Sequence, residues 1–118
     1  RRDSVLHLPQ LSWYNLERYG EPEAGVYIQY NFAERVAHAA KPRPLAAGTI
    51  VGSGTVANQD TGVGASCLAE IRMLEIIAEG KPSTPFMSFG DTVRIEMLDA
   101  AGASIFGAIE QEIRRYGG

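Results

Sequence analysis

Apolar and polar residues alternate in short stretches of the N-terminal third of the chain, and this alternation predicts strands. Residues 5–14, VLHLPQLSWY, are rich in β-formers. They also contain Pro9, which has no amide to donate to a ladder, so we expect one bent or bulged strand. Residues 15–25 mix turn residues with charges and predict a loop, in which Glu21 and Glu23 would be solvated acids. The alternation at 26–30 then predicts a short strand.

Two segments have apolar residues at helical spacing. Asn31 can cap a helix over FAERVAHAA, residues 32–40, and Glu34 stands where it completes a capping box. Pro42 would end this helix. Residues 66–79, SCLAEIRMLEIIAE, repeat apolar side chains every three to four positions before Gly80, so the pattern alone predicts a second helix.

The C-terminal third returns to the alternation that is typical of strands. Residues 93–97 alternate apolar and charged side chains, DAAG at 99–102 is a small-residue turn, and 104–113 resumes the pattern. This arrangement predicts a β-hairpin with a longish turn. Residues 45–51 predict one more strand, which leads into a glycine-rich segment.

The glycine-rich segment, GTIVGSGTVANQDTGVG at 48–64, is the most unusual stretch of the chain. Glycine is favoured where the backbone needs a positive φ or where another group must approach it, so the segment predicts a tight turn, a ligand contact or both. Residues 52–57, GSGTVA, formally fit a dinucleotide fingerprint. No helix is predicted to start inside them, however, and no acidic residue ends a second strand about 20 residues on, which argues against nucleotide binding.

Composition and charge narrow the possible functions. The chain has 118 residues, enough for one domain, and its net charge of −3 is spread without a basic stripe. We therefore expect no nucleic-acid partner. The chain has one cysteine and no apolar run near the roughly 18 residues of a membrane span, so we expect a protein of the cytoplasm. It opens with Arg-Arg-Asp and strand-like sequence, which suggests a fragment of a longer protein.

Few residues stand out as chemical groups. Cys67 has no histidine nearby in sequence and is better interpreted as a small buried residue than as a nucleophile. His7 and His38 belong to unrelated elements and predict no metal site. Glu70 differs, because it stands among apolar residues and risks desolvation. It could serve acid–base chemistry, or it could form a surface salt bridge with Arg72 or Arg43.

Five segments taken in order resemble the C-terminal half of the fumarylacetoacetate hydrolase family, in particular its bacterial fumarylacetoacetase-like or 2-keto-4-pentenoate hydratase-like branch. They are FAERVAHAAK, RPLAAGTIVGSGTVAN, GASCLAEIR, PSTPFMSFGDTVRIEM and FGAIEQEI. The resemblance spans nearly the whole chain and is weakest over residues 1–25. It implies that residues 1–118 are the C-terminal part of a catalytic domain, mainly β with short helices, that folds as a fumarylacetoacetate hydrolase-like β-roll of mixed sheets. Many members of the family are homodimers.

The resemblance also implies an activity. Family members hydrolyse carbon–carbon bonds in diketo acids such as fumarylacetoacetate or acylpyruvates, or hydrate or decarboxylate related oxo acids, often in the catabolism of aromatic compounds. They use a divalent metal, Mg²⁺, Mn²⁺ or Ca²⁺, as a Lewis acid. The metal carboxylates and the histidine of a catalytic His-Glu pair lie upstream of the part that this chain represents. The chain by itself would then be inactive, and it would need the missing N-terminal part of the same protein.

Carried over onto this sequence, the family's substrate loop corresponds to Ser53, Gly54 and Thr55, whose Thr hydroxyl contacts the carboxylate of a small oxo acid. The glutamate of the His-Glu pair corresponds to Glu70, so Thr55 and Glu70 are the expected catalytic residues. The family also has a strand here, which implies a strand at 67–72 where periodicity predicts a helix. The competing interpretation is a catalytically inactive β-rich domain that serves assembly or small-molecule binding.

Overall fold

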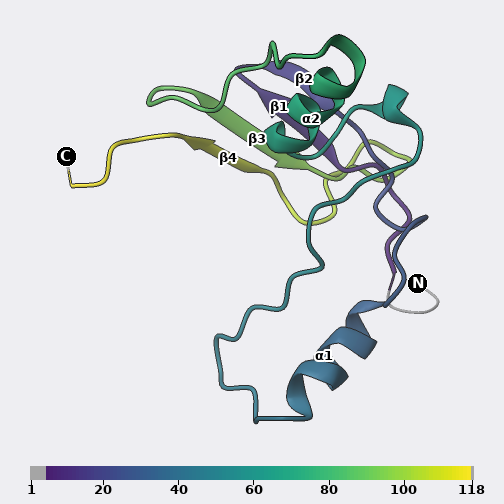
Figure 1. Ribbon diagram of the computed structural model, residues 1–118. Helices are drawn as coiled ribbons and strands as arrows, with labels where there is room; N and C mark the ends of the chain where they lie inside the picture. Colours follow the sequence, from purple (N-terminus) through teal and green to yellow (C-terminus); the bar gives the residue numbers. More distant parts are fainter. Residues whose placement is uncertain (1–4, 118) are drawn as a thin grey trace.

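Four strands form one sheet in the computed structural model, which describes residues 5–117 (Figure 1). The sheet is antiparallel throughout, with the strand order β2-β1-β3-β4. The strands are β1 (Leu11–Tyr14), β2 (Glu17–Gly20), β3 (Thr92–Glu96) and β4 (Ile109–Glu112), and the helices are α1 (Phe32–Ala40), the 3-10 turn η1 (Thr61–Val63) and α2 (Leu68–Glu79). A sheet with short helices agrees with the predicted fold class, whereas the β-roll of mixed sheets stays a prediction.

The first hairpin corrects the prediction of an unbroken loop over 15–25. Asn15 and Leu16 both have positive φ, 48° and 69°, which is the backbone geometry of a two-residue turn that fits twisted strands. The chain can therefore reverse at once, and β2 pairs with β1. The predicted strand at 5–14 is realised only from Leu11 onward, because Pro9 forms an isolated bridge with Glu23 instead.

Two predicted strands are absent, and in each case a local polar contact takes the backbone groups. At 26–30 the amide of Val26 donates to the Glu23 carboxylate at 2.6 Å, and the segment forms turns and bends. At 45–51 the amide and hydroxyl of Thr49 donate to the carbonyl of Ala46, at 3.1 and 2.8 Å, and close a turn. Neither segment pairs with a neighbouring strand.

Both helices predicted from periodicity are present, and their caps explain their limits. In α1 the Glu34 amide donates to the Asn31 side chain at 2.9 Å, and the Glu34 carboxylate accepts from the Asn31 amide at 2.8 Å, which completes the capping box. Helix α2 begins after Cys67 and ends at Gly80, which has φ 81°. The strand that the resemblance implied at 67–72 is therefore wrong. Neither α-helix within 5–117 has the length and apolar character needed to cross a membrane.

The C-terminal hairpin is confirmed, with a longer connection than expected. β3 and β4 pair from Thr92 opposite Glu112 to Ile95 opposite Ile109. The connection is shaped by Asp99, whose side chain accepts from the amides of Ala101 and Ala103, at 2.9 Å each. The turn thus lies at residues 99–103, and β4 begins only at Ile109.

The buried apolar core of the described residues is small and lies where the segment before α2 meets the first hairpin. It consists of Leu11, Ala65 and Leu68, and the side chain of Ser12 is also buried. Gly20 and Gly64 form a bridge there, and a Cβ on Gly20 would overlap the carbonyl oxygen of Ala65. This is the place where close backbone approach requires glycine. In contrast, α1 and the extended chain after it project away from the sheet (Figure 1).

Candidate functional site

A cavity of about 510 Å³ lies beside the glycine-rich segment. Three parts of the chain line it: residues 23–24 and 27–30 after the first hairpin, Arg35 from the first turn of α1, and residues 53–57 except Gly54. The segment that leaves the sheet and the segment that returns to it thus form two of its walls. Of the predicted site residues, Ser53 and Thr55 share this cavity.

The glycine-rich backbone next to the cavity is open. A Cβ placed on Gly52 or on Gly54 would meet no other atom within 4 Å. Gly54 has φ 85°, a conformation that residues with side chains rarely adopt, so this turn needs glycine for its geometry. The Ser53 hydroxyl donates to the Gly54 carbonyl at 3.3 Å, and Thr55 is exposed. The space beside Gly52 and Gly54 is thus not filled by the described protein atoms, as a ligand contact would require.

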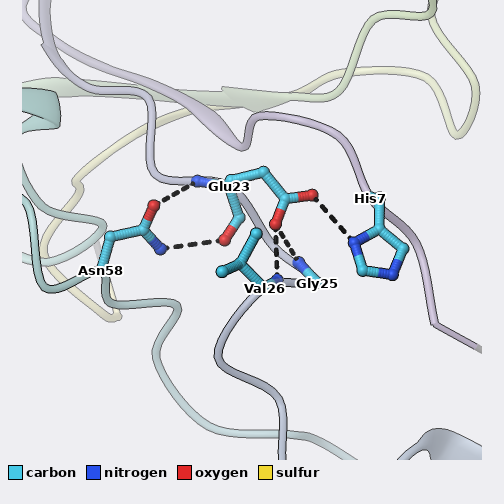
Figure 2. A network of polar contacts seen from close by, with 5 residues as sticks. All are labelled: His7, Glu23, Gly25, Val26 and Asn58. Carbon is cyan, nitrogen blue, oxygen red and sulfur yellow. Dashed lines mark hydrogen bonds and ion pairs between the residues drawn. The ribbon is translucent and has the colours of Figure 1, made fainter.

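Asn58, within the glycine-rich segment, is hydrogen-bonded to Glu23 of the segment that follows the first hairpin (Figure 2). Its side-chain oxygen accepts from the backbone amide of Glu23 at 2.9 Å, and its side-chain amide donates to the Glu23 carbonyl at 2.9 Å. One side chain therefore satisfies both backbone groups of one residue, as a neighbouring strand would. A second contact is nearby, where the Ser66 hydroxyl donates to the Val56 carbonyl at 2.6 Å.

Glu23 is a structural centre of the cavity wall, so its interpretation as a solvated acid is wrong. Its carboxylate accepts from the amides of Gly25 and Val26, at 2.8 and 2.6 Å, and its other oxygen lies 3.5 Å from Nδ1 of His7 (Figure 2). Glu21 is exposed as expected and pairs with Arg18. The sequence contained no signal for this role, because turns closed by a side chain are typical of Asn, Asp, Ser and Thr rather than of Glu.

Glu70 lies apart from this cavity, on the first turn of α2. Its amide donates to the Cys67 sulfur at 3.4 Å, which makes that partly exposed thiol a helix cap rather than a fully buried residue. Atom Oε2 of Glu70 is buried and has no hydrogen-bond partner among the described residues. The structure therefore brings Ser53 and Thr55 together and leaves Glu70 with an unmatched acceptor.

Arg72 does not form the salt bridge with Glu70 that was one of the alternatives. It donates to the Thr84 carbonyl, and its guanidinium lies 4.3 Å from the ring centre of Phe86. Glu75, one turn further along α2, accepts from the Thr84 hydroxyl and from the amides of Thr84 and Ser83. These donors stabilise the charged carboxylate and lower the pKa of Glu75 to about 2, the Thr84 side chain having the largest effect. The two side chains fix the chain that follows α2.

Asp91 connects the start of β3 to the first hairpin. The Ser88 amide, the Tyr14 hydroxyl and the Asn15 side chain all donate to its carboxylate. These hydrogen bonds lower the pKa of Asp91, and the bond to Asp91 raises the pKa of Tyr14. No local pattern predicts the contacts with the first hairpin, because Tyr14 and Asn15 lie 77 and 76 positions from Asp91 in the sequence.

The residues of 5–117 contain no group of three or more His, Cys, Asp or Glu side chains that could hold a metal ion. His7 and Glu23 form a pair of such side chains, but the Glu23 carboxylate already accepts hydrogen bonds from two backbone amides. A divalent metal therefore does not fit the donors available here.

Comparison with known proteins identifies the family. The sequence profile described as "Fumarylacetoacetate (FAA) hydrolase C-terminal" matches residues 14–114. The match includes the glycine-rich segment, both α-helices and all of β2, β3 and β4. The comparison with curated proteins gives no match. Because the profile covers most of the chain, the protein belongs to the fumarylacetoacetate hydrolase family, and residues 14–114 correspond to the family's C-terminal domain.

Proposed function

We propose that this chain is the C-terminal part of the catalytic domain of a metal-dependent enzyme that hydrolyses a carbon–carbon bond in a diketo acid of the fumarylacetoacetate or acylpyruvate type. The observation that carries the proposal is the cavity of about 510 Å³ that Ser53 and Thr55 line next to the open backbone of Gly54. A hydroxyl pair beside a backbone free of side chains suits the carboxylate of a small oxo acid. Thr55, being exposed, would donate a hydrogen bond to that carboxylate.

Glu70 would act through a histidine that this chain does not place beside it. Its buried Oε2 accepts no hydrogen bond from the described residues, and an N–H of an imidazole is a suitable donor for it. A carboxylate that accepts from one imidazole nitrogen leaves the other free to take a proton from water. In this proposal the histidine comes from a part of the protein that precedes residue 1, and Glu70 is a positioning residue for it.

The exposed apolar residues support a covering part of the protein. The Cα radius of gyration is 16.5 Å, whereas a compact domain of this length has about 13.5 Å. Ile50 and Phe106 expose 94% and 73% of their surface. Such residues favour burial against another body of protein. That body would be the preceding part of the same polypeptide, and it would bring the metal ligands that residues 5–117 lack. A homodimer is the further expectation.

The proposal is tested by Thr55→Ala in the full-length protein, supplied with Mg²⁺ or Mn²⁺ and assayed on acylpyruvates by the loss of diketo-acid absorbance. We expect kcat/KM to fall at least tenfold, because a hydrogen bond to a charged group is lost. Thr55→Ser keeps the hydroxyl and is the matched control, which should retain most activity. Wild-type activity that survives Thr55→Ala unchanged would remove Thr55 from the site. No wild-type turnover across a panel of oxo acids would instead favour an inactive assembly or binding domain.

A further inference from the structure

The cavity beside the glycine-rich segment contains one cationic side chain that the family resemblance does not assign. Arg35, in the first turn of α1, lines the cavity together with Ser53 and Thr55. Its Nε donates to the Tyr30 carbonyl at 2.7 Å, and the side chain is half-buried. One nitrogen of the guanidinium is thus fixed to the backbone, while its two terminal nitrogens make no hydrogen bond within residues 5–117.

The charge of Arg35 is not neutralised by the described part of the chain. No Asp or Glu carboxylate of residues 5–117 lies within 4.0 Å of it. The neighbouring Glu34 carboxylate is used by the Asn31 amide in the capping box. Glu23, the acid on the cavity wall, is held by the amides of Gly25 and Val26. Both nearby acids are therefore committed to backbone donors.

A guanidinium whose two terminal nitrogens make no hydrogen bond within residues 5–117 is suited to a carboxylate, which it can bind through two parallel hydrogen bonds. Ser53 and Thr55 belong to the segment that returns to the sheet, whereas Arg35 belongs to α1, so the polar groups of the cavity come from two separate elements. The cavity thus presents two places for negative groups. Tyr27 and Tyr30 also line the cavity.

We propose that Arg35 is a specificity-determining residue that binds a second carboxylate of the substrate, so that the preferred substrate is an oxo acid with a carboxylate at each end. This inference rests on the proposed function and extends it to the far end of the substrate. A carboxylate at the far end of the substrate does not change during the reaction, so Arg35 would bind the ground state and the transition state equally. Its loss should then raise KM and leave kcat nearly unchanged.

The experiment compares Arg35→Gln, Arg35→Lys and the control Arg43→Gln in the full-length protein. Arg43 is exposed, so the control removes the same charge outside the cavity. The substrates are two acylpyruvates of equal length, one ending in a carboxylate and one in its methyl ester. We expect Arg35→Gln to raise KM for the diacid about tenfold, equal to about 1.4 kcal/mol, and to leave KM for the ester unchanged. Arg35→Lys should recover part of the loss, and Arg43→Gln should change neither value.

Binding of glutarate, an unreactive dicarboxylate, gives a second readout by titration calorimetry. Wild-type protein should bind glutarate at least tenfold more tightly than Arg35→Gln does, and butyrate should not distinguish the two proteins. If no oxo acid is turned over but glutarate binding depends on Arg35, the proposed reaction is wrong and the carboxylate site stands. The assignment of Arg35 is overturned if Arg35→Gln remains folded and active and raises KM for the diacid and the ester equally. It is also overturned if neither KM changes.

Discussion

The contact between Asn58 and Glu23 should be the most important single polar contact for the shape of the cavity, and Asn58→Ala tests this. The substitution removes two hydrogen bonds, each 2.9 Å long, between the glycine-rich segment and the wall opposite. Each such bond stabilises a fold by about 0.5–1.5 kcal/mol net, so we expect the free energy of unfolding to fall by roughly 1–3 kcal/mol. The upper part of this range applies because the Glu23 amide and carbonyl, which are half-buried, lose their partners.

Urea denaturation of the full-length protein, followed by far-ultraviolet circular dichroism, measures the change. Asn58→Asp is an informative variant, because it keeps an acceptor for the Glu23 amide but cannot donate to the Glu23 carbonyl. It should be destabilised less than Asn58→Ala at neutral pH. The exposed neighbour Gln59 provides the control Gln59→Ala, which should leave the urea midpoint unchanged.

The same variant should also impair catalysis under the proposed function. Asn58 stands three positions after Thr55, so releasing it lets the substrate-binding segment move relative to the other wall. A displacement of about 1 Å can cost up to 100-fold in rate, and we expect kcat/KM of Asn58→Ala to fall at least tenfold. If Asn58→Ala has the urea midpoint and the kcat/KM of wild-type protein, the two walls of the cavity are held by other contacts.

Two further predictions concern stability. Hydrogen bonds in the fold lower the pKa of Glu75 from an ordinary value near 4.5 to about 2. The charged carboxylate therefore stabilises the fold above pH 4.5, and this contribution is lost as the pH falls from 4.5 towards 2. Glu75→Gln should therefore flatten the dependence of the urea midpoint on pH between 4.5 and 2. Glu79→Gln, at an exposed position on the same helix, should not. If wild-type protein and Glu75→Gln show the same pH dependence, Glu75 does not stabilise the fold in this way. Leu16 is 86% exposed and has φ 69°, a backbone conformation that is strained for any residue except glycine. Leu16→Gly should therefore raise the free energy of unfolding by about 1 kcal/mol, and Leu16→Ala should give no such gain. A decrease on Leu16→Gly would contradict the argument from backbone strain.

The elements that the sequence predicted correctly are those in which the local signal and the tertiary surroundings agree. Asn31 and Glu34 cap α1 as the pattern required, and Gly80 ends α2. For α2 the periodicity of apolar residues was a better guide than the resemblance, which implied a strand at 67–72. A repeat of 3.6 residues over more than three turns outweighs an analogy to a family pattern, because it is a property of this chain's own residues.

Two of the wrong strand predictions, one strand expected but absent and one present but not expected, depend on contacts that no local pattern reveals. Residues 26–30 alternate as a strand does, but the Val26 amide donates to the Glu23 carboxylate and is therefore not available to pair with another strand. β2 was interpreted as loop because its residues are charged, yet it occupies an edge of the sheet, where exposed charged side chains are tolerated. In the candidate site, the glycine-rich segment drew attention to Ser53 and Thr55. The contact between Asn58 and Glu23 joins residues 35 positions apart, and Arg35 reaches the same cavity as Thr55 only through the fold, so no local pattern predicts either.

The glycines at 52 and 54 serve a different purpose from those at 20 and 64, and the difference explains how the site is built. Gly20 and Gly64 are required because another backbone occupies the space of their missing side chains. Around Gly52 and Gly54 that space is empty of described protein atoms, although the segment is fastened immediately afterwards through Val56 and Asn58. A loop without internal packing keeps a defined position only when contacts at its end hold it. The chain thus combines a bare backbone, which a ligand can approach, with fixed anchors two to four residues away, which set where that ligand must lie.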